Sequence, residues 1–527
     1  MAEQTQNKVS RENEPENIIG TIISDDISPS FEIFRFKAKH NKYVTPGTLV
    51  AAQVNSNTFL VGRITSSHEY NPHESSDRIT VRDSMGIKPD YPEEDLSLTI
   101  HRRYQVEIID EVKEINRGYE IYPPEKMPKS GSHVFVPPRD VIIDIMGLES
   151  DPEKSLNIGS LAVSLAEEAE MSVKIKRDII QRHVFIGGTT GGGKSYAARV
   201  LAEEIHKQGI PIIFFDTQYE FVPLTEALNG TVLVPGKNYN VKLSSLTESE
   251  LLDLIPTITH ELHVNLLTRA FLTLKEGGET GIPQKTLQSN EENEANRNNF
   301  GVNELVQTIQ TVGQNMQTKQ NTIDMVKGRT HYYLRNYDFI GQGFNWQEIL
   351  KPDSILCINC KKFSRNALQL ILASTLRELT ELRKKRKINP FVIFIDEAHL
   401  FVPQGENSPC KQIIRESVRI GRHHGICTVL ITQSPMDIDK KAIRQCNTRL
   451  LFALEPDQLQ SIQGVRADAT QEMIDRLPKS PVGTCILTGT YETIKHAVPV
   501  KIRLMENPEA DAGKAPNIFS EVKIKNE

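Results

Sequence analysis

The sequence has 527 residues, enough for about three domains of ordinary size or for one enlarged domain and a smaller one. Its hydrophobic share of 38% is low for a compact globular protein and predicts long polar surface segments. The net charge of −6 gives no support for a basic nucleic-acid binder, but a ring that is acidic outside and basic in its channel would have the same balance.

The N-terminus and the cysteines indicate an intracellular protein. Residues 1–17 are polar and charged and lack the apolar region of a signal peptide, so we expect a flexible tail. No run approaches the ~20 apolar residues of a membrane helix, so we expect a cytoplasmic protein without a membrane partner. Cys357 and Cys360 form a CxxC pair, but residues three apart on a strand face opposite sides. We therefore interpret both as core residues.

Short β-like runs separated by turn residues fill residues 18–147. Residues 48–54 and 58–65 are two such runs joined by three polar residues, which predicts a hairpin. Further short runs follow at 98–100, 104–109 and 133–136. Strands at this spacing are typical of a small barrel, so we predict an N-terminal β-barrel over 18–147.

The pattern then changes to alternating strands and helices, which predicts an α/β core over 158–505 with a parallel sheet. Central strands are predicted at 184–186, 210–215, 391–395, 426–432 and 450–454, and edge strands at 485–487 and 497–502. Residues 245–350 are predicted to form a helical insertion. Within it, residues 276–299 are too polar to bury much surface, so we expect a mobile loop. Residues 506–527 are predicted to be a loose C-terminal tail.

The strongest motif is Gly188-Thr-Thr-Gly-Gly-Gly-Lys-Ser195, which fits G-x-x-x-x-G-K-[ST] between a predicted strand and a predicted helix. Its glycines let backbone N–H groups surround phosphate oxygens, and the helix N-terminus adds a positive dipole end. Lys194 can reach the β- and γ-phosphates of ATP, and the Ser195 hydroxyl can bind Mg²⁺. The predicted nucleotide-binding residues are Gly188, Thr189, Thr190, Gly191, Gly192, Gly193, Lys194, Ser195 and Tyr196. The fold class follows as a RecA-like P-loop ATPase core.

An acidic pair ends the strand predicted at 391–395. Ligands bind in open α/β sheets at the carboxyl ends of the strands, where Asp396 and Glu397 are expected to lie. We predict that Asp396 holds Mg²⁺ through water and that Glu397 polarises the attacking water.

Two other polar side chains follow predicted strands. Asp216 ends the strand at 210–215, and we favour a role in orienting the metal or the water over the alternative of a turn cap. Gln433 follows the strand at 426–432. It could sense the γ-phosphate or be an ordinary loop residue, and the residues alone do not decide.

Basic residues form two groups in the C-terminal half. Arg415, Arg419 and Arg422 have spacings of four and three, which place them on one helical face. Such a face could reach the ATP of a neighbouring subunit as an arginine finger, or it could be a solvated basic surface. The run at 383–387 precedes the strand at 391–395, so we place it at the opposite sheet edge and favour a solvated face over a DNA contact.

Several segments together resemble the HerA branch of the HerA/FtsK ATPases. They are Gly187-Gly-Thr-Thr-Gly-Gly-Gly-Lys-Ser195, Phe215-Asp-Thr-Gln-Tyr-Glu220, Ile395-Asp-Glu-Ala-His399, Arg419-Ile-Gly-Arg-His-His-Gly425, Thr432-Gln-Ser-Pro435 and Arg444-Gln-Cys-Asn-Thr448. The resemblance is strong over residues 180–500 and looser over 18–145. It implies a homohexameric ring that translocates double-stranded DNA through a central channel, with ATP and Mg²⁺ between subunits.

The resemblance also implies roles that the residue pattern leaves open. Arg422 is the expected trans-acting finger with Arg419 second, Arg182 completes the same site, and Gln433 is the sensor. Family members work with a nuclease or an NADase-type effector, often through the barrel, in DNA end processing or antiphage defence. The alternative function is a ring scaffold that gathers and switches an effector by its nucleotide state. A conjugation or secretion motor is a third possibility, which the lack of a membrane helix disfavours.

Overall fold

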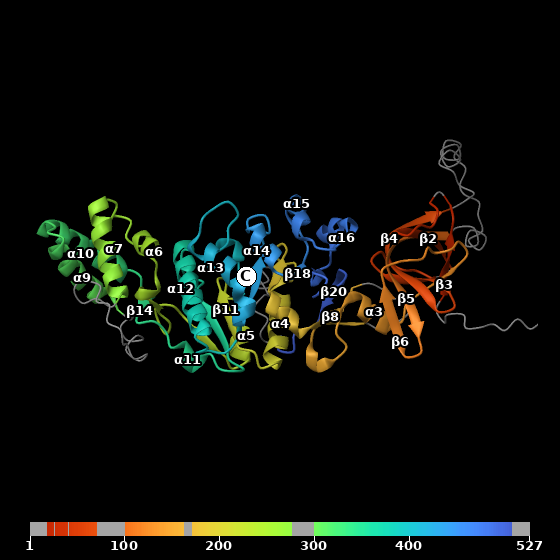
Figure 1. The fold of residues 1–527 in the computed structure, drawn as a ribbon, viewed down its shortest axis with the longest axis horizontal. Helices are drawn as coiled ribbons and strands as arrows, with labels where there is room; N and C mark the ends of the chain where they lie inside the picture. Colours follow the sequence, from red (N-terminus) through yellow and green to blue (C-terminus); the bar gives the residue numbers. More distant parts are fainter. Residues whose placement is uncertain are drawn as a thin grey trace, which may run out of the picture.

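The computed structural model describes residues 18–25, 27–39, 42–70, 101–162, 171–276 and 300–508. The tail predicted at 1–17, the strand predicted at 98–100, almost all of the loop predicted at 276–299, and residues 509–527 lie outside these ranges. The molecule is elongated, with a small sheet at one end, a large sheet in the middle and a group of helices at the other end (Figure 1). Among the described residues, no helix is long and apolar enough to cross a membrane.

The small sheet is antiparallel and closes on itself. Its strands are β1 (Ile18–Ile23), β2 (Ile33–Ala38), β3 (Leu49–Asn55), β4 (Thr58–Tyr70), β5 (His101–Ile115), β6 (Gly118–Tyr122) and β7 (His133–Phe135). The strand order is β2-β1-β7-β3-β4-β5-β6. Because β2 also pairs with β5, all of these strands except β6 form a closed ring. The predicted hairpin is confirmed, because β3 and β4 pair from Leu49 with Arg63 to Asn55 with Thr58.

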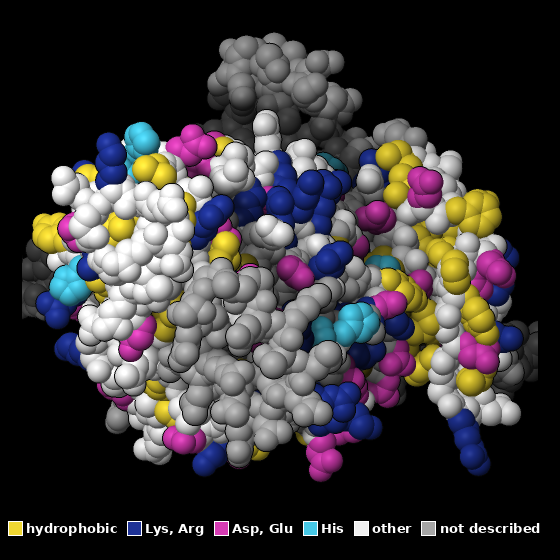
Figure 2. Space-filling model, turned by 60° about the vertical axis from the view of Figure 1, so that its left-hand side comes forward, with side chains coloured by type: hydrophobic (Ala, Val, Ile, Leu, Met, Phe, Trp, Pro, Cys, Tyr) yellow, Lys and Arg dark blue, Asp and Glu magenta, His cyan; other side chains and the backbone are white. Residues whose placement is uncertain are grey.

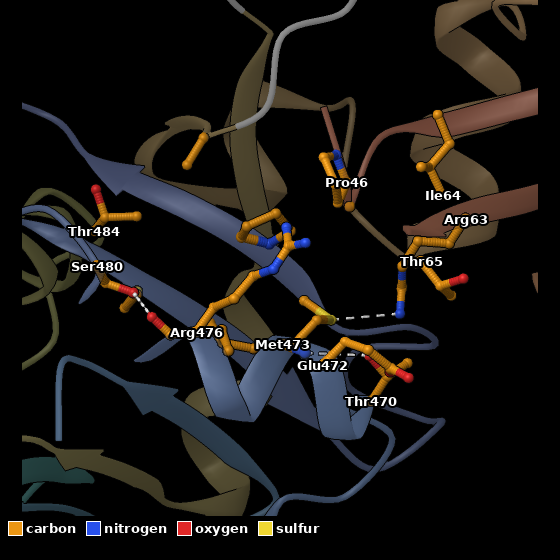
Figure 3. Close-up of a pocket in the computed structure, with 15 residues that line it drawn as sticks. Pro46, Arg63, Ile64, Thr65, Thr470, Glu472, Met473, Arg476, Ser480 and Thr484 are labelled. Carbon is orange, nitrogen blue, oxygen red and sulfur yellow. Dashed lines mark hydrogen bonds between the residues drawn. The ribbon is translucent and has the colours of Figure 1, made fainter. Parts of the chain in front are cut away.

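Helix α3 (Arg139–Met146) follows the small sheet, and a buried arginine on β4 fastens that sheet to the rest of the chain (Figure 3). Arg63 is 4% exposed, and its Nη2 donates to the carbonyl oxygen of Ala497 at 2.7 Å. Its Nη1 lies 3.6 Å from Met473 Sδ, beside a cavity of about 150 Å³ between the two parts. Burial lowers the pKa of the Arg63 guanidinium, and the Asp468 carboxylate opposes that shift. Arg63 therefore contacts the large sheet's domain through its charged end.

The large sheet contains eleven strands in the order β12-β15-β11-β16-β17-β10-β18-β19-β20-β8-β9. Pairing is parallel from β12 to β18 and antiparallel from β18 to β9. The parallel strands are β10 (Val184–Gly187), β11 (Ile212–Asp216), β12 (Thr231–Leu233), β15 (Ile355–Asn359), β16 (Phe391–Ile395), β17 (Ile426–Thr432) and β18 (Thr448–Leu451). The antiparallel strands are β8 (Ser155–Leu161), β9 (Ser172–Lys176), β19 (Thr484–Gly489) and β20 (Val498–Ile502).

The positions of the central strands agree with the apolar runs, but the expectation of edge strands at 485–487 and 497–502 was wrong. Strand β19 lies between β18 and β20, and β20 lies between β19 and β8. The reason is that β8 and β9, which precede the P-loop in the chain, pair on the outer side of β20. A pairing partner that comes from more than 300 positions earlier leaves no local pattern in residues 485–502.

Both faces of the parallel strands are buried. On β11, Ile212 and Phe214 belong to a core shared with α4 (Lys194–Lys207) and α5 (Val222–Ala227). Ile213 and Phe215 belong to a second core, shared with α12 (Arg365–Lys384), α13 (Pro409–His424) and α14 (Lys440–Gln445). Burial on two sides explains why these strands are continuous apolar runs without alternation. The six cysteines are all free and buried, and Cys357 and Cys360 belong to opposite cores, as expected.

Helices occupy most of the described chain between β12 and β15. They are α6 (Glu248–Asp253), α7 (Glu261–Lys275), α9 (Val302–Asn315), α10 (Gln320–Arg335) and α11 (Trp346–Ile349), with a short pairing of β13 (Val241–Lys242) and β14 (Ile340–Gly341). Helix α6 begins at a capping box in which Thr247 and Glu250 bond each other's backbone N–H groups. Helices α7, α9 and α10 lie at the end of the molecule away from the small sheet (Figure 1). After β18 the chain forms α15 (Leu459–Ile462) and α16 (Gln471–Arg476), and it then returns to the sheet as β19.

A buried histidine joins the start of β10 to β17. His183 is 2% exposed, and its Nδ1 accepts a hydrogen bond from the backbone N–H of Thr428 at 3.0 Å. Burial lowers the pKa of His183 to about 4, because the charged imidazolium would lose its hydration. The neutral ring is therefore the form that the fold accommodates.

This shift predicts a stability that decreases in mild acid. Between pH 6.5 and pH 4 the unfolded chain binds a proton on His183 that the folded chain does not, so stability decreases as the pH decreases. The difference amounts to about 2 kcal/mol between pH 7 and pH 5. We expect His183→Asn, which keeps an acceptor and does not titrate, to have a smaller decrease in chemical-denaturation midpoint over that interval than the wild type. Equal decreases in the two proteins would contradict this assignment.

Candidate active site

Four parallel strands deliver polar side chains to one edge of the large sheet. Gly187 at the end of β10 pairs with Thr432 at the end of β17. Ile395 at the end of β16 pairs with Leu430 of β17, and with Phe215 of β11 on its other side. The segments that follow these strands therefore emerge side by side at the carboxyl edge, where ligands bind in open α/β sheets.

The P-loop connects β10 to α4, as predicted, and two glycines are required by its shape. A Cβ at Gly188 would lie 2.6 Å from the Phe452 Cβ, which is closer than real contacts. Gly193 has φ of +106°, and a Cβ there would lie 3.1 Å from the Gly483 Cα. Thr189 fixes the loop on its other side, because its N–H and hydroxyl both donate to the carbonyl oxygen of Ala453. The loop is thus built for a narrow backbone path at the start of a 14-residue helix.

Lys194 lies across the loop. Its Nζ donates to the carbonyl oxygen of Thr189 at 2.7 Å, and the side chain is largely buried. Burial lowers the pKa of Lys194, while the carboxylates of Glu397, Glu220 and Asp396 act in the opposite direction. A cation surrounded by acidic groups at this position can contact phosphate oxygens and neutralise their charge. Ser195 and Tyr196 follow in the first turn of α4, both half-buried.

The acidic pair lies where the sequence places it, at the end of β16. Asp396 is buried, and its Oδ2 accepts a hydrogen bond from the Thr217 hydroxyl at 2.9 Å. Glu397 has φ of +49°, so the chain turns out of the strand at this residue. Its Oε1 accepts a hydrogen bond from Gln218 Nε2 at 2.8 Å. Its Oε2 is buried and accepts no hydrogen bond from the described residues, which suits an oxygen that orients water.

Oxygen ligands for Mg²⁺ are available beside the P-loop. Burial raises the pKa of Asp396, and the neighbouring carboxylates of Glu397, Asp216 and Glu220 raise it further. A divalent cation at this position would offset that repulsion, and a carboxylate with a Ser195 hydroxyl is the donor set that Mg²⁺ prefers. Ser195 and Asp396 therefore fit the predicted metal. Among the described residues, no group of three His, Cys, Asp or Glu side chains forms a separate metal cluster.

Asp216, the third residue predicted to bind the metal, accepts hydrogen bonds from the backbone of the loop that follows it. The side chain is fully buried, and both oxygens accept backbone N–H groups of the following loop. Its Oδ1 accepts from Gln218, Tyr219 and Glu220, and its Oδ2 accepts from Phe221 and Val222. With five donors on two oxygens, the carboxylate is used for shaping the loop 217–222. These contacts favour the turn-cap alternative and place Gln218 beside Glu397, while the metal-binding role stays a prediction.

Gln433 lies against the tip of the P-loop. Its Oε1 accepts a hydrogen bond from the Thr190 hydroxyl at 2.6 Å, so the amide side chain contacts the loop that is predicted to hold the phosphates. This position favours the sensor interpretation over that of an ordinary loop residue.

Sequence reasoning missed two residues that contact or approach Glu397. Gln218 is part of a segment that the family resemblance includes, but no periodicity places it against residue 397. The sequence assigns no role to His399, although this residue ends another of those segments. Its Nδ1 lies 3.1 Å from the Thr432 hydroxyl and 3.3 Å from Glu397 Oε2, so it connects the ends of β16 and β17. The two-residue spacing between Glu397 and His399 was the available signal.

The predicted finger arginines lie far from this edge. Arg182 ends a 3-10 turn just before β10 and forms an ion pair with Glu492, at the opposite end of the strand from the P-loop. Arg419 is exposed near the end of α13, which precedes the first residue of β17. Of Arg422 the structure describes the backbone alone. Arg415 is partly exposed and forms an ion pair with Asp439.

The basic run at 383–387 is at the sheet edge opposite the nucleotide site, as expected. Arg383 Nε donates to the carbonyl oxygen of His424 at 2.7 Å, which joins the ends of α12 and α13.

Comparison with known proteins matches the core of the chain to two families. Residues 156–379 match the family described as Helicase HerA, central domain, and residues 359–497 match the AAA-like domain. A DNA double-strand break repair helicase HerA of Sulfolobus acidocaldarius is 24% identical over 388 residues, which cover 71% of this chain and 76% of that protein. The corresponding helicase of Pyrococcus furiosus is 22% identical over 453 residues, covering 75% of this chain and 77% of that protein.

A solved structure shows the same fold. VirB4 of Thermoanaerobacter pseudethanolicus superposes with a TM-score of 0.51 at 15% identity, over 68% of this chain and 98% of that one. The prediction of an α/β P-loop ATPase core is confirmed, and with it the prediction of an ATPase.

The two roles considered for Asp216 predict different responses to Mg²⁺. In Asp216→Asn, an amide nitrogen replaces one acceptor oxygen and faces backbone N–H groups, so the loop that carries Gln218 shifts. We expect the maximal rate of ATP turnover to change about tenfold, the size expected for the loss of a charged hydrogen bond, while the Mg²⁺ concentration for half-maximal activity stays unchanged. Asp396→Asn is the matched variant, and in it the required Mg²⁺ concentration increases. A similar increase in Asp216→Asn would restore the metal-binding role.

Proposed function

Because this chain belongs to the HerA-type P-loop ATPases, we propose that it works as a homohexameric ring that moves double-stranded DNA through a central channel. The observation that carries the proposal is the division of the site between two edges of one sheet. Lys194, Glu397 and Gln433 gather at the carboxyl edge. Arg182 and the end of α13 lie at the other edge.

The length of β17 makes that division decisive. Strand β17 has seven residues, Ile426–Thr432, and spans roughly 20 Å at about 3.3 Å per residue. The P-loop follows β10 at the level of the last residue of β17. An arginine that precedes the first residue of β17 cannot reach across the strand to the P-loop of the same chain. A second copy that presents its arginine edge to the first copy's P-loop would complete the site, and repetition of such a head-to-tail contact generates a ring. ATP and Mg²⁺ would then lie between subunits, with Arg422 and Arg419 as trans-acting fingers and Arg182 beside them.

Double-stranded DNA is the proposed cargo. The relatives from Sulfolobus acidocaldarius and Pyrococcus furiosus carry names as DNA double-strand break repair helicases, which supports the proposal by similarity. The net charge of −6 is no obstacle, because charge is unevenly distributed. Figure 2 shows Lys and Arg side chains gathered near the top of one face.

The small closed sheet is the proposed docking platform for a nuclease or NADase-type effector. It corresponds in position to the barrel predicted over 18–147, and the core predicted over 158–505 holds the nucleotide site. The sheet lies at the end of the molecule opposite helices α7, α9 and α10 (Figure 1). A partner bound there would leave the nucleotide edge accessible, as DNA end processing or antiphage defence by a motor with an effector requires.

The first test is steady-state ATP turnover with and without double-stranded DNA. We expect DNA to stimulate turnover in the wild type, and Lys194→Ala and Glu397→Gln to abolish it, because one loses the phosphate contact and the other the water-orienting carboxylate. Turnover that both variants abolish but DNA leaves unchanged would support the alternative function of a nucleotide-switched scaffold. Turnover that survives in both variants would contradict the assignment of these residues.

A mixing experiment tests whether the arginines act between subunits. Arg422→Ala and Arg419→Ala are expected to decrease turnover strongly, since arginine fingers contribute about 10³–10⁵ in rate. When Arg422→Ala is mixed with Lys194→Ala, some interfaces combine an intact P-loop with an intact finger, so activity should partly recover.

The matched control is a mixture of Lys194→Ala with Glu397→Gln, whose lesions lie in the same half of the site and cannot complement each other. Absence of recovery in mixed rings of Arg422→Ala and Lys194→Ala would contradict action in trans.

A further inference from the structure

Five loops follow one another along the carboxyl edge of the large sheet. In strand order they are the loop after β15 with Lys361 and Lys362, the loop after β11 with Gln218 and Tyr219, the acidic pair after β16, Gln433 after β17, and the P-loop after β10. With neighbouring strands about 4.8 Å apart, the two lysines lie roughly 20 Å along the edge from the P-loop. Gln218 stands between the two ends of this row.

Gln218 connects the surface to the catalytic carboxylate. The side chain is exposed, whereas the Glu397 that accepts its hydrogen bond is 7% exposed. Strand β11, which carries Gln218, and strand β10, which carries the P-loop, lie on opposite sides of β16. The 2.8 Å hydrogen bond from Gln218 Nε2 therefore holds Glu397 Oε1 toward the side away from the nucleotide. Release of this bond would let the carboxylate turn toward the P-loop.

The loops that carry Gln218 and the lysines are joined by short contacts. The backbone N–H of Cys360 donates to the carbonyl oxygen of Asp216 at 2.8 Å. The Asp216 side chain holds the N–H groups of Gln218 and Tyr219 at 3.1 and 2.8 Å. Lys361 Nζ lies 5.5 Å from the centre of the Tyr219 ring, within the range of a cation–π contact. Asp216 therefore links the two loops, and a displacement of Lys361 or Tyr219 reaches Gln218 through this residue.

The surface beside Gln218 has the chemistry of a phosphate-backbone contact. Lys361 and Lys362 are exposed, and Tyr219 is 40% exposed with φ of +73°, held out by the Asp216-capped loop. Arg365 lies a few residues further on and is paired with Glu406 at 3.0 Å. Adjacent lysines with an exposed aromatic ring are suited to a polyanion that also presents apolar sugar and base surfaces.

We propose that Tyr219, Lys361 and Lys362 contact the phosphate backbone of DNA, and that this contact releases Glu397 from Gln218 so that hydrolysis proceeds. The inference rests on the proposed function and adds to it a contact surface and a means of coupling. Gln218 is in this account a positioning residue that restrains Glu397 until DNA binds.

The positioning role is tested by ATP turnover of full-length Gln218→Ala and Gln218→Leu with a 30-base-pair duplex. We expect turnover without DNA to increase about tenfold, comparable to the loss of one charged hydrogen bond, and the ratio of stimulated to unstimulated turnover to decrease toward one. Duplex affinity, measured by fluorescence anisotropy, should stay at the wild-type value. A decrease in both rates with an unchanged ratio would overturn the restraint.

The contact surface is tested by the double variant Lys361→Ala/Lys362→Ala. Each lost phosphate contact lowers the slope of log affinity against log salt by about 0.9, so we expect weaker duplex binding with a slope that is lower by about two. The control is Lys385→Ala/Lys387→Ala, with the same charge change at exposed positions at the other sheet edge. Wild-type affinity and slope in the first double variant would overturn the proposal, as would an altered oligomeric state with unaltered DNA binding, which indicates a contact between copies.

The two proposals fail in distinguishable ways. If the wild type neither binds duplex nor responds to it in ATP turnover, the proposed DNA motor itself is wrong. If the wild type responds and the Gln218 and lysine variants respond identically, the inference alone is wrong.

Discussion

The parallel pairing of β10, β17, β16 and β11 is the constraint on which the site depends. Because these strands run in the same direction, the segment after each emerges at the same edge, with neighbours about 4.8 Å apart. Residues separated by about two hundred positions in the chain, such as Lys194 and Glu397, are neighbours for this reason alone. Burial of the strands on both faces makes their positions rigid, so side chains at the edge keep their spacing.

Within that frame, carboxylates at similar positions do different work. Asp216 ends β11 and Asp396 directly follows β16, these two strands pair with each other, and both side chains are buried. Asp216 accepts five backbone N–H groups and so forms the loop after β11, whereas Asp396 accepts the Thr217 hydroxyl beside the P-loop. The larger number of backbone donors around Asp216 favours a structural role for it, and Asp396 remains the carboxylate predicted to bind Mg²⁺. The loop that Asp216 holds in turn brings Gln218 to Glu397, so Asp216 determines which hydrogen-bond donor the Glu397 carboxylate meets.

The sheet also separates residues that the proposed mechanism brings together. Lys194 and Glu397 lie at one edge, and Arg182 and the end of the helix that carries Arg419 lie at the other. The length of the strands between these edges sets their separation. The proposed ring would use that separation, because a site completed by a second copy couples hydrolysis to the relative positions of the subunits.

The sequence by itself determined the nucleotide-binding loop, the acidic pair and the central strands, because each is a local pattern: glycine spacing, paired acids after an apolar run, and runs buried on both faces. The tertiary structure alone decided the partners of Asp216, the placement of Gln218 beside Glu397, and the inner position of β19 and β20. Gln218 meets Glu397, and β20 meets β8, across long stretches of the chain, and such meetings leave no periodicity in it. The partners of Asp216 are local, but a carboxylate at the end of a strand can cap a turn or bind a metal, so the pattern did not decide between them.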